Sequence, residues 1–316
     1  MDLDAPSNRG FAATAILIDM IPPKLAEKMV EVWGEEGSEW IARFPKLLQE
    51  ASAKWKLTEL EPAPGLSYNF VAFAKRGGVP VVLKLAVNSD DLENESRVLQ
   101  AYAGKHAAKL IDGDPKLGAI LLERLVPGTP LWQTWTVERD DEQTHIAADL
   151  ILRAKRLGND DFPTIERWCR AYKRCLNKMK SNNPDYKLIE NAMRLAAELR
   201  SDGSQEGYLL HGDLHHGNIL SAGDSWKFID PKGVVGELSF EAGAFLRNPV
   251  DRILDVPDLA GLIERRLNIF ADVLKLDMSR LKAWCFCVCV LSICWSIEDN
   301  RAGNKAAFAC ARVLSI

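Results

Sequence analysis

The stretch "LLHGDLHHGNIL", residues 209–220, is the most informative part of this sequence. Leucines enclose three histidines, two glycines, an aspartate and an asparagine. The glycines disfavour a helix, so the stretch is predicted to be a loop. Asp213 and Asn218 lie five residues apart in it. This is the spacing found in the catalytic loops of phosphoryl transfer.

Phosphoryl transfer requires a carboxylate that orients a hydroxyl nucleophile and accepts its proton, and an amide oxygen that helps to hold Mg²⁺ against nucleotide phosphates. Asp213 is therefore the predicted catalytic base, and Asn218 is a predicted metal ligand. The stretch "WKFIDPKG" supplies a second oxygen ligand, Asp230, at the end of an apolar strand twelve residues after Asn218. We expect a hairpin to bring Asn218 and Asp230 together.

A zinc ion bound by His211, His215 and His216 is the alternative interpretation of the loop. Neighbouring histidines rarely bind one ion together, and no glutamate lies at the spacing of a metallohydrolase helix. The pattern therefore favours magnesium over zinc.

A lysine interrupts an apolar strand further upstream. Lys84 lies in "VVLKL", where a buried ammonium group needs an anion or a carboxylate, although an exposed strand lysine is the alternative. Glu95 follows eleven residues later on a predicted helix, where it can pair with Lys84 over the α- and β-phosphates of a nucleotide; Glu93 is the rival. The preceding turn, "PGLSYNF", offers Gly65 and Ser67 as further phosphate donors.

The first part of the chain alternates between helical and strand patterns. Residues 22–56 carry apolar positions at helical spacing, with prolines at or near helix starts, which predicts two opening helices. Residues 68–86 form two β-rich runs around Gly77 and Gly78, which predicts an antiparallel hairpin. Residues 90–104, "DDLENESRVLQAYAG", then predict a helix that stops at its glycine.

The stretch "GAILLERLVPGTPL", residues 118–131, is an apolar strand that runs into Pro127 and Gly128, where regular structure is expected to break. Beyond this point the pattern is mostly helical. We therefore predict an α+β fold of two lobes. Residues 1–126 form a small N-terminal lobe with an antiparallel sheet, and residues 127–316 form a larger, mainly helical C-terminal lobe.

Composition limits the partners of the chain. Forty basic and 44 acidic residues give a net charge of -4, and no basic cluster is present to follow a phosphate backbone, so nucleic acid is not the expected partner. The N-terminus lacks the basic opening of a secretory signal, which predicts a cytoplasmic protein. The most apolar run, "WCFCVCVLSICW" at residues 284–295, covers about a dozen residues, short of the roughly 20 that cross a bilayer. It predicts a core helix with reduced, buried cysteines and no membrane span.

The ordered set of Lys84, Glu95, Asp213, Asn218 and Asp230 resembles the aminoglycoside phosphotransferase family, which is related to the protein kinases. More narrowly, the loop at 209–220 and the stretches "PGLSYNFVAFA", "LLERLVPGTPL" and "FIDPKGVVGELSFEAGAFLRNP" resemble the streptomycin 6-kinase and hydroxyurea kinase branch. The similarity covers most of the chain.

The resemblance implies a bilobal protein-kinase-like fold with ATP and Mg²⁺ as cofactors. It implies that adenine contacts backbone groups of the lobe linker near Arg124 to Val126. It also implies that Mg²⁺ is held by Asn218 and Asp230 and that Asp213 is the catalytic base.

Departures from the protein-kinase pattern argue against a protein substrate. "DPKG" stands where protein kinases have Asp-Phe-Gly, "HGD" replaces "HRD", and the segment between Asp230 and Glu241 is too short for an activation segment. Glu241 resembles a family position that stabilises the lower lobe. Lys232 and Glu237 either contact the substrate or order the loop.

The resemblance implies a small hydroxylated acceptor, an aminoglycoside antibiotic such as streptomycin. Acidic pairs of the second lobe, with Asp160, Glu298 and Asp299 among them, would attract a cationic acceptor, although solvated surface charge explains any single pair more simply. A cellular sugar, an amino alcohol or hydroxyurea is the alternative acceptor. A nucleotide-binding pseudokinase is the alternative function, and the presence of both Lys84 and Asp213 argues against it.

Overall fold

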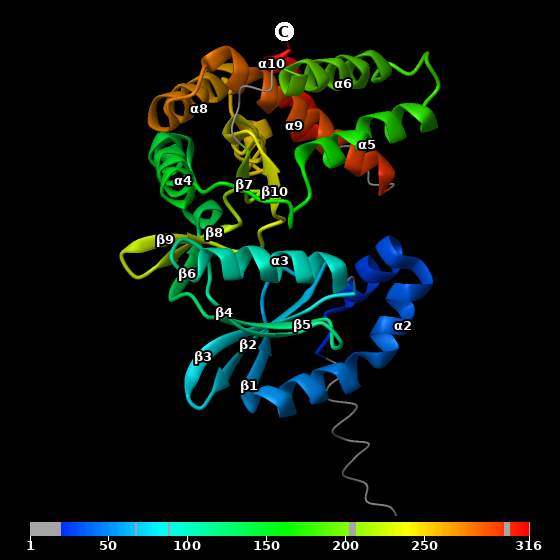
Figure 1. Cartoon of the computed structure of the whole chain (residues 1–316), viewed down its shortest axis with the longest axis vertical. Helices are drawn as coiled ribbons and strands as arrows, with labels where there is room; N and C mark the ends of the chain where they lie inside the picture. Colours follow the sequence, from blue (N-terminus) through cyan, green and yellow to red (C-terminus); the bar gives the residue numbers. More distant parts are fainter. Residues whose placement is uncertain (1–19, 67, 88, 202–206, 300–303, 316) are drawn as a thin grey trace, which may run out of the picture. The chain divides into compact units, whose positions relative to one another are not determined.

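The computed structural model describes residues 20–66, 68–87, 89–201, 207–299 and 304–315. The chain separates into two compact units, which are Met1–Gly104 with Ala108–Arg124, and Lys105–Ala107 with Leu125–Ile316. The first unit contains a five-stranded sheet, and the second is mainly helical (Figure 1). The predicted α+β organisation is therefore confirmed.

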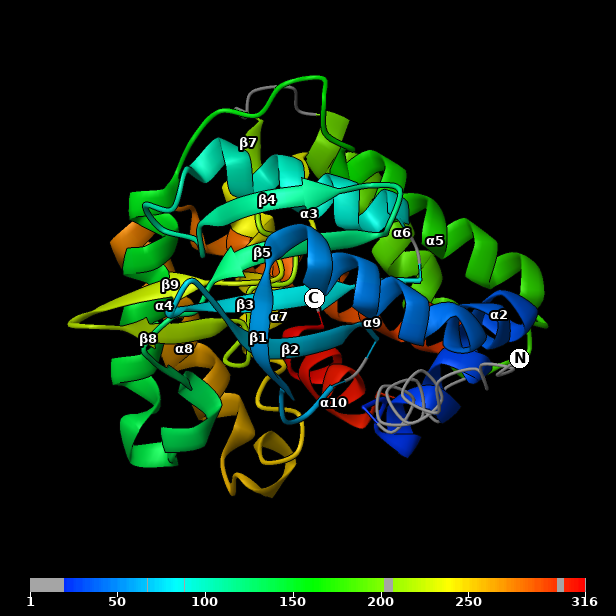
Figure 2. The ribbon, with the colours of Figure 1, turned by 90° about the horizontal axis from the view of Figure 1, so that it is seen from below.

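The sheet of the first unit is antiparallel. Its strands are β1 (Leu57–Pro62), β2 (Phe70–Arg76), β3 (Val79–Leu85), β4 (Leu110–Asp114) and β5 (Ala119–Glu123). They pair in the order β1-β2-β3-β5-β4, which can be followed in Figure 2. Gly77 and Gly78 join β2 to β3 with φ values of +57° and +82°. Two positive φ values are what a type I′ turn requires, so the predicted hairpin is confirmed.

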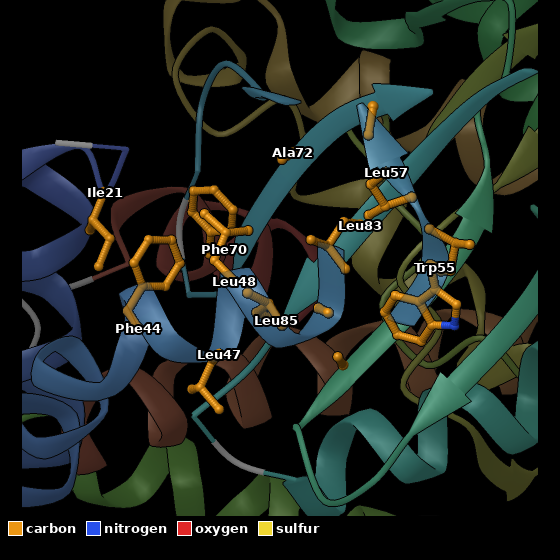
Figure 3. Close-up of a cluster of buried hydrophobic side chains, with 14 of the residues drawn as sticks. Ile21, Phe44, Leu47, Leu48, Trp55, Leu57, Phe70, Ala72, Leu83 and Leu85 are labelled. Atoms are coloured by element: carbon orange, nitrogen blue, oxygen red, sulfur yellow. The ribbon is translucent and has the colours of Figure 1, made fainter. Parts of the chain in front are cut away.

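The two faces of this sheet contact different helices. Phe70 pairs with Leu85 in register, and both side chains are buried on one face together with Phe44 of α2 (Pro23–Trp55), as Figure 3 shows. Successive residues of a strand point to opposite faces. Lys84 therefore points away from α2, toward the face on which α3 (Ser89–Tyr102) lies.

The long element α2 corresponds to the two predicted opening helices. Gly34 has non-helical angles, with φ +57° and ψ -122°, and it separates the element into two helical segments at a kink. Prolines mark the start of the first segment, as expected, but Pro45 lies inside the second segment. The prediction was wrong there because the burial of this face outweighs the loss of one helical hydrogen bond.

The second unit is built around one helix, α9 (Met278–Glu298). It packs against α5 (Ile165–Lys178), α6 (Tyr186–Ser201), α7 (Ala242–Leu246) and α10 (Lys305–Leu314). Figure 1 shows α5, α6 and α10 beside it. The remaining helices are α4 (Asp140–Ala154) and α8 (Leu259–Leu274). All seven cysteines of the chain are buried free thiols, as predicted.

The length of α9 corrects one expectation. The helix has 21 residues and, alone among the described helices, is long and apolar enough to cross a membrane by length and composition. Because helical structure continues beyond the apolar run on both sides, counting apolar residues underestimated it. The most apolar window of α9 is 72% buried inside the structure, so burial identifies it as a core helix.

Five short strands complete the described part of the second unit. β6 (Pro127–Pro130) pairs with β8 (Ile219–Ala222), which pairs with β9 (Ser225–Phe228). β7 (Tyr208–Leu210) pairs with β10 (Val234–Gly236). Pro127 and Gly128 were expected to break regular structure, but they begin β6 instead. A proline is tolerated there because it is the first residue of an edge strand.

Candidate active site

The pairing of β7 with β10 brings two separate loops together. Leu210 lies opposite Val234, so the loop that follows β7 and the loop that precedes β10 start at the same end of the strand pair. The carbonyl oxygen of His211 accepts the backbone N–H groups of Lys232 and Gly233, at 2.8 and 3.2 Å. These bonds place the loop that contains Asp213 beside the loop that contains Asp230.

The hairpin of β8 and β9 brings the two predicted metal ligands close to each other. Ile219 pairs with Phe228, and the N–H of Ile229 donates to the carbonyl of Asn218 at 3.0 Å. Asn218 and Asp230 therefore lie at the open end of one hairpin, as the sequence predicted.

Asp213 lies between two nitrogen-containing side chains. Arg247 donates from Nη2 to Oδ1 of Asp213 at 3.1 Å, and Nε2 of His215 lies 3.7 Å from Oδ2. Burial raises the pKa of Asp213, but His215, Arg247 and Lys232 outweigh burial and hold that pKa below its ordinary value. The side chain is 31% exposed. Asp213 is thus an ionised carboxylate that a hydroxyl group can reach.

The histidines of the loop fix its shape through their ring nitrogens. Nδ1 of His211 accepts the N–H of Asp213 at 3.2 Å, so the proton of the ring is on Nε2, which contacts the carbonyl of Ile229 at 2.9 Å. Nδ1 of His215 accepts the N–H of Gly217 at 3.0 Å, which places its own ring proton on Nε2, toward Asp213. Burial lowers the pKa of His211 to about 4 and also lowers the pKa of His215.

His216 has a different environment. Its ring stacks on Phe245, with 3.9 Å between centroids, and burial lowers its pKa well below the ordinary value. In the described part of the chain, no group of three His, Cys, Asp or Glu residues is arranged to hold a metal ion. Nδ1 of His211 and Nδ1 of His215 each accept a backbone N–H group, so these nitrogens are not available to bind zinc.

Glu241 anchors the loop that contains Asp213 from a distance of 30 residues along the chain. Its carboxylate accepts the backbone N–H of His211 at 2.7 Å and that of Gly212 at 3.0 Å. Burial raises the pKa of Glu241 to about 7, and the charge of Asp213 adds to the rise, while the backbone hydrogen bonds oppose it. The stabilising role that the resemblance implies for Glu241 has a direct physical basis in these contacts.

The side-chain oxygens of Asn218 and Asp230 are suitable ligands for a magnesium ion. Nδ2 of Asn218 donates to the carbonyl of Asp213 at 3.0 Å, so the amide oxygen points the other way as an acceptor. Asp230 adopts a positive φ of +56° and contacts Lys232, whose Nζ lies 3.1 Å from Oδ1. Amide and carboxylate oxygens are the ligands that Mg²⁺ prefers.

The first unit contains the predicted lysine–glutamate pair. Nζ of Lys84 lies 2.6 Å from Oε2 of Glu95, and both residues are 5% exposed. Glu93, the rival, lies two residues away on the exposed side of α3. A buried ammonium group is stable only beside a carboxylate of this kind, so the apolar context of Lys84 was an informative signal.

The other residues predicted to contact the nucleotide differ in their exposure and in their partners. Gly65 is exposed, has a φ of +72° and has open space around its Cα atom, while Ser67 lies outside the described residues. The guanidinium of Arg124 stacks on the ring of Phe73 at 3.8 Å. Val126 is exposed, but its carbonyl already accepts the N–H of Gly223 at 2.8 Å.

The predicted substrate contacts of the second unit are partly taken up by other partners. Glu237 accepts from Nε of Arg280 and from Nε1 of Trp284, both at 2.7 Å, so its carboxylate orders the protein instead of facing an acceptor. Glu298 forms a two-bond pair with Arg174, at 2.8 and 3.0 Å. Asp160 is exposed in the loop before α5.

Asp299 caps the C-terminal end of α9 through its backbone N–H. Lys232 is 43% exposed and contacts Asp230. In the described residues, neither Asp160 nor Glu298 forms a hydrogen bond or an ion pair with the loop that contains Asp213. The structure therefore places only Lys232 of the five predicted substrate residues beside the loop.

Arg247 is the site residue that sequence reasoning missed. It lies in "AGAFLRNP", where a single charge follows an apolar run, and its side chain is 11% exposed. This is the same signal that identified Lys84, a charge in an apolar segment that needs a buried partner. Nothing in the local pattern identifies Asp213 as that partner, because 34 residues separate the two.

Comparison with known proteins agrees with this geometry. The family model for aminoglycoside/hydroxyurea antibiotic resistance kinases matches residues 54–300. A streptomycin 6-kinase of Streptomyces glaucescens is 29% identical over 314 residues, which cover 96% of this chain and 99% of that protein. A hydroxyurea phosphotransferase of Kitasatospora aureofaciens is 27% identical over 287 residues, which cover 89% of this chain and 81% of that protein.

A solved structure of a thermostable mutant of an aminoglycoside phosphotransferase, in a ternary complex with ADP and hygromycin B, matches with a TM-score of 0.60 at 14% identity. The match covers 85% of this chain and 98% of that one. This likeness confirms the protein-kinase-like fold. The family model covers well over half of the sequence, and its members are phosphotransferases. The chain therefore belongs to the aminoglycoside/hydroxyurea antibiotic resistance kinase family.

Proposed function

We propose that this chain is a cytoplasmic, ATP-dependent kinase that transfers the γ-phosphate to a hydroxyl group of an aminoglycoside antibiotic such as streptomycin. The observation that carries the proposal is Asp213, an ionised and accessible carboxylate in a loop whose neighbours Asn218 and Asp230 offer oxygen ligands. Phosphoryl transfer needs little covalent chemistry from the protein, so positioning and charge account for most of the catalysis.

In this proposal Asp213 orients the acceptor hydroxyl and takes its proton during transfer. The lowered pKa keeps Asp213 ionised at neutral pH. It also makes the carboxylate a weak base, which suits a loose transition state in which the proton leaves late. Asn218 and Asp230 would hold Mg²⁺, which supplies positive charge against the phosphate oxygens when it is bound.

The first unit would bind the rest of the nucleotide. Lys84, held in place by Glu95, would contact the α- and β-phosphates. Gly65 and Ser67 would offer further donors to the phosphates. The backbone of the linker from Arg124 to Val126 would contact adenine through groups other than the Val126 carbonyl, which Gly223 occupies.

The acceptor is the part of the proposal with a specific alternative. The streptomycin 6-kinase that matches nearly the whole chain favours an aminoglycoside, and the hydroxyurea phosphotransferase favours hydroxyurea. A net charge of -4 suits a cationic antibiotic better than a neutral acceptor. The negative charges of Asp160, Glu298 and Asp299 would attract its cationic groups, and Glu298 is paired with Arg174.

The test is coupled ADP release with Mg-ATP across streptomycin, other aminoglycosides, hydroxyurea and simple sugars, with Asp213→Asn as the blank. Stimulation by streptomycin that is absent in the blank is the expected result. Stimulation by hydroxyurea alone would replace the acceptor. Nucleotide binding without turnover on any acceptor would overturn the proposed aminoglycoside kinase, in favour of a pseudokinase or of a kinase that acts on an untested metabolite.

Two variants separate the roles of the aspartates. Asp213→Asn is expected to remove most of the turnover, about 100-fold or more, and to leave Mg-ATP binding nearly intact. Asp230→Ala is expected to weaken metal-dependent nucleotide binding itself. Turnover in Asp213→Asn equal to that of the parent would overturn the assignment of the base.

A further inference from the structure

The side chain that orients Asp213 has little support of its own. Arg247 directs Nη2 to Asp213, and its Nε is buried without a hydrogen-bond partner in the described part of the chain. A guanidinium held at one nitrogen can rotate unless its backbone is fixed. The position of Arg247 therefore depends on what holds the chain on either side of it.

One buried nitrogen contacts the backbone on both sides of Arg247, in addition to the N–H of Asn248, which donates to the carbonyl of Phe245 at 3.1 Å, and Sγ of Cys310, which donates to that of Leu246 at 3.6 Å. Nη1 of Arg266, on α8, donates to the carbonyls of Phe245 at 3.0 Å, Leu246 at 2.9 Å and Asn248 at 2.8 Å. Two of these carbonyls end α7 and the third follows Arg247. The last carbonyls of a helix lack helical partners and attract positive charge, so Arg266 satisfies them and fixes the exit of the chain from α7.

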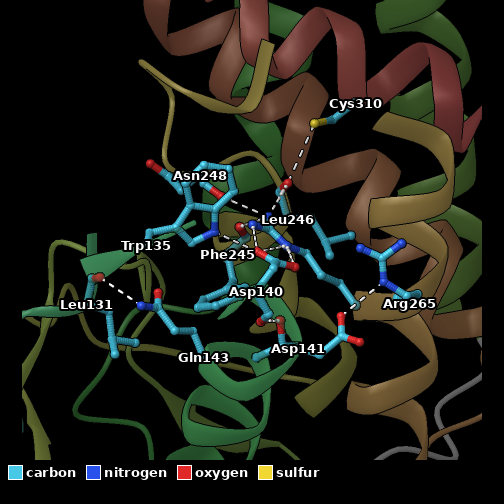
Figure 4. A network of polar contacts seen from close by, with 12 residues as sticks. Leu131, Trp135, Asp140, Asp141, Gln143, Phe245, Leu246, Asn248, Arg265 and Cys310 are labelled. Atoms are coloured by element: carbon cyan, nitrogen blue, oxygen red, sulfur yellow. Dashed lines mark hydrogen bonds and ion pairs between the residues drawn. The ribbon is translucent and has the colours of Figure 1, made fainter. Parts of the chain in front are cut away.

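Arg266 is in turn held by one carboxylate. Asp140, the first residue of α4, accepts Nε of Arg266 at 2.9 Å and Nη2 at 2.6 Å, and it accepts Nε1 of Trp135 at 2.7 Å. Both charged side chains of this pair are fully buried. Figure 4 shows Asp140 and Trp135 converging with Phe245, Leu246 and Asn248.

A buried ion pair of this kind is an inefficient way to gain stability, because desolvation offsets much of the attraction. It is an efficient way to fix geometry, since each of the three guanidinium nitrogens of Arg266 has at least one buried acceptor. We propose that the buried pair of Asp140 and Arg266 positions Arg247, and through Arg247 the carboxylate of Asp213, for phosphoryl transfer. The proposal rests on the proposed role of Asp213 as the base.

The same two helices provide a matched control. Arg265 and Asp141 are adjacent in sequence to Arg266 and Asp140. They form an ion pair at 3.1 Å, and both side chains are about half exposed. Asp141→Asn removes the same charge from the same helix without touching the buried pair. It is expected to leave kcat and both KM values within about twofold of the parent.

Asp140→Asn is expected to lower kcat about tenfold and to leave the KM for nucleotide and for acceptor within about twofold, because the base is misplaced while the binding groups are not. Rates are expressed per folded molecule, with the folded fraction measured by nucleotide binding. A purely structural role would reduce the folded fraction and leave kcat per folded molecule unchanged, which would overturn the proposal.

A double variant tests whether the effect passes through Arg247. Arg247→Gln is expected to lower kcat about 30-fold, and Arg247→Lys, which keeps the charge, to recover part of that loss. Asp140→Asn combined with Arg247→Gln should be no slower than Arg247→Gln alone, because both changes break one chain of contacts. Losses that multiply would show that the two residues act independently and would overturn the proposal.

A milder variant covers the case in which Asp140→Asn does not fold. Trp135→Phe removes one hydrogen bond to Asp140 and keeps the ion pair, and it is expected to lower kcat about threefold at unchanged KM. Parent-like kcat in folded Trp135→Phe would then overturn the proposal. Failure of the proposed function gives a different result, because the parent itself would show no turnover above the Asp213→Asn blank.

Discussion

The carboxylate of Glu241 accepts the backbone N–H of His211 at 2.7 Å through its Oε2 atom. Its other oxygen accepts the N–H of Gly212 at 3.0 Å. A loop that exposes the carboxylate of Asp213 and the amide of Asn218 cannot rely on apolar packing alone, because its polar groups must stay accessible. One buried carboxylate supplies the rigidity instead, by satisfying two backbone donors that the loop leaves unpaired.

Glu241→Ala is expected to destabilise the protein by about 3 kcal/mol, because two buried N–H groups lose their acceptor and a cavity forms. Glu241→Gln should cost about half as much, since its amide oxygen can still accept one of them. Urea unfolding measures both values, with Glu264→Ala on the exposed face of α8 as the control. A loss below about 1 kcal/mol in Glu241→Ala would contradict the anchoring role.

Gly212→Ala is expected to destabilise the fold by about 2–4 kcal/mol. Gly212 has a φ of +83°, and an added Cβ atom would lie 2.5 Å from the ring of Trp168. Gly223→Ala is the matched comparison, because Gly223 also has a positive φ, +59°, but has nothing within 4 Å. Gly223→Ala should be destabilised by backbone strain alone, about 1–2 kcal/mol. Equal losses in thermal unfolding would mean that contact with Trp168 is not the cause.

Glu95→Gln is expected to weaken ATP binding about tenfold, since Lys84 loses the charge that holds it and its burial becomes unfavourable. Glu93→Gln, two residues earlier on the exposed side of the same helix, should bind ATP like the parent. Nucleotide titration followed by fluorescence compares the two variants. Similar affinity in both would refute a specific role for the pair of Lys84 and Glu95.

The buried histidine His211 is expected to limit stability in acid. Burial lowers its pKa from 6.5 to about 4, so the folded protein holds the neutral ring. The neutral ring contributes about 3 kcal/mol to the free energy of unfolding above pH 6.5. This contribution decreases as the pH falls and is gone below about pH 4. Protonation would also place a hydrogen on Nδ1, where the ring accepts the N–H of Asp213.

His211→Asn should therefore flatten the fall in unfolding free energy between pH 6.5 and 4, whereas His145→Asn, at an exposed position of α4, should not. Glu241 acts in the opposite direction. Its pKa is raised to about 7, so its contribution is lost as the pH rises toward and through 7. The histidine effect is for that reason measured as the difference between parent and variant. An unchanged acid slope in His211→Asn would contradict a buried neutral ring.

Much of the site followed from patterns that act over short distances. The hairpin that joins Asn218 to Asp230, and the pairing of Lys84 with Glu95, depend on strand alternation and helix spacing within about a dozen residues. These forces operate whatever the rest of the chain does. The same is true of the turn at Gly77 and Gly78, where only residues that tolerate positive φ fit.

The two predictions about prolines were wrong because burial and strand pairing outweighed a local signal. Pro45 lies inside a helix because its face is covered, and Pro127 begins a strand because β8 pairs with it. For Glu237 the sequence left two roles open, a substrate contact or the ordering of the loop, and Glu298 was among the acidic residues expected to attract a cationic acceptor. Their partners, Arg280 and Arg174, lie 43 and 124 residues away in sequence, and no spacing rule identifies pairs at such distances.

Short-range patterns predicted the fold class, the loop at 209–220 and the oxygen groups of Asn218 and Asp230, because each depends on residues that are near one another in the chain. What holds that loop in place became visible only once the chain was folded. Glu241 and Arg247 contact the loop from 30 and 34 residues away in sequence. Arg266 pairs with Asp140, which is 126 residues away. Such contacts arise when packed helices exclude water and leave each buried charge or N–H group with one available partner.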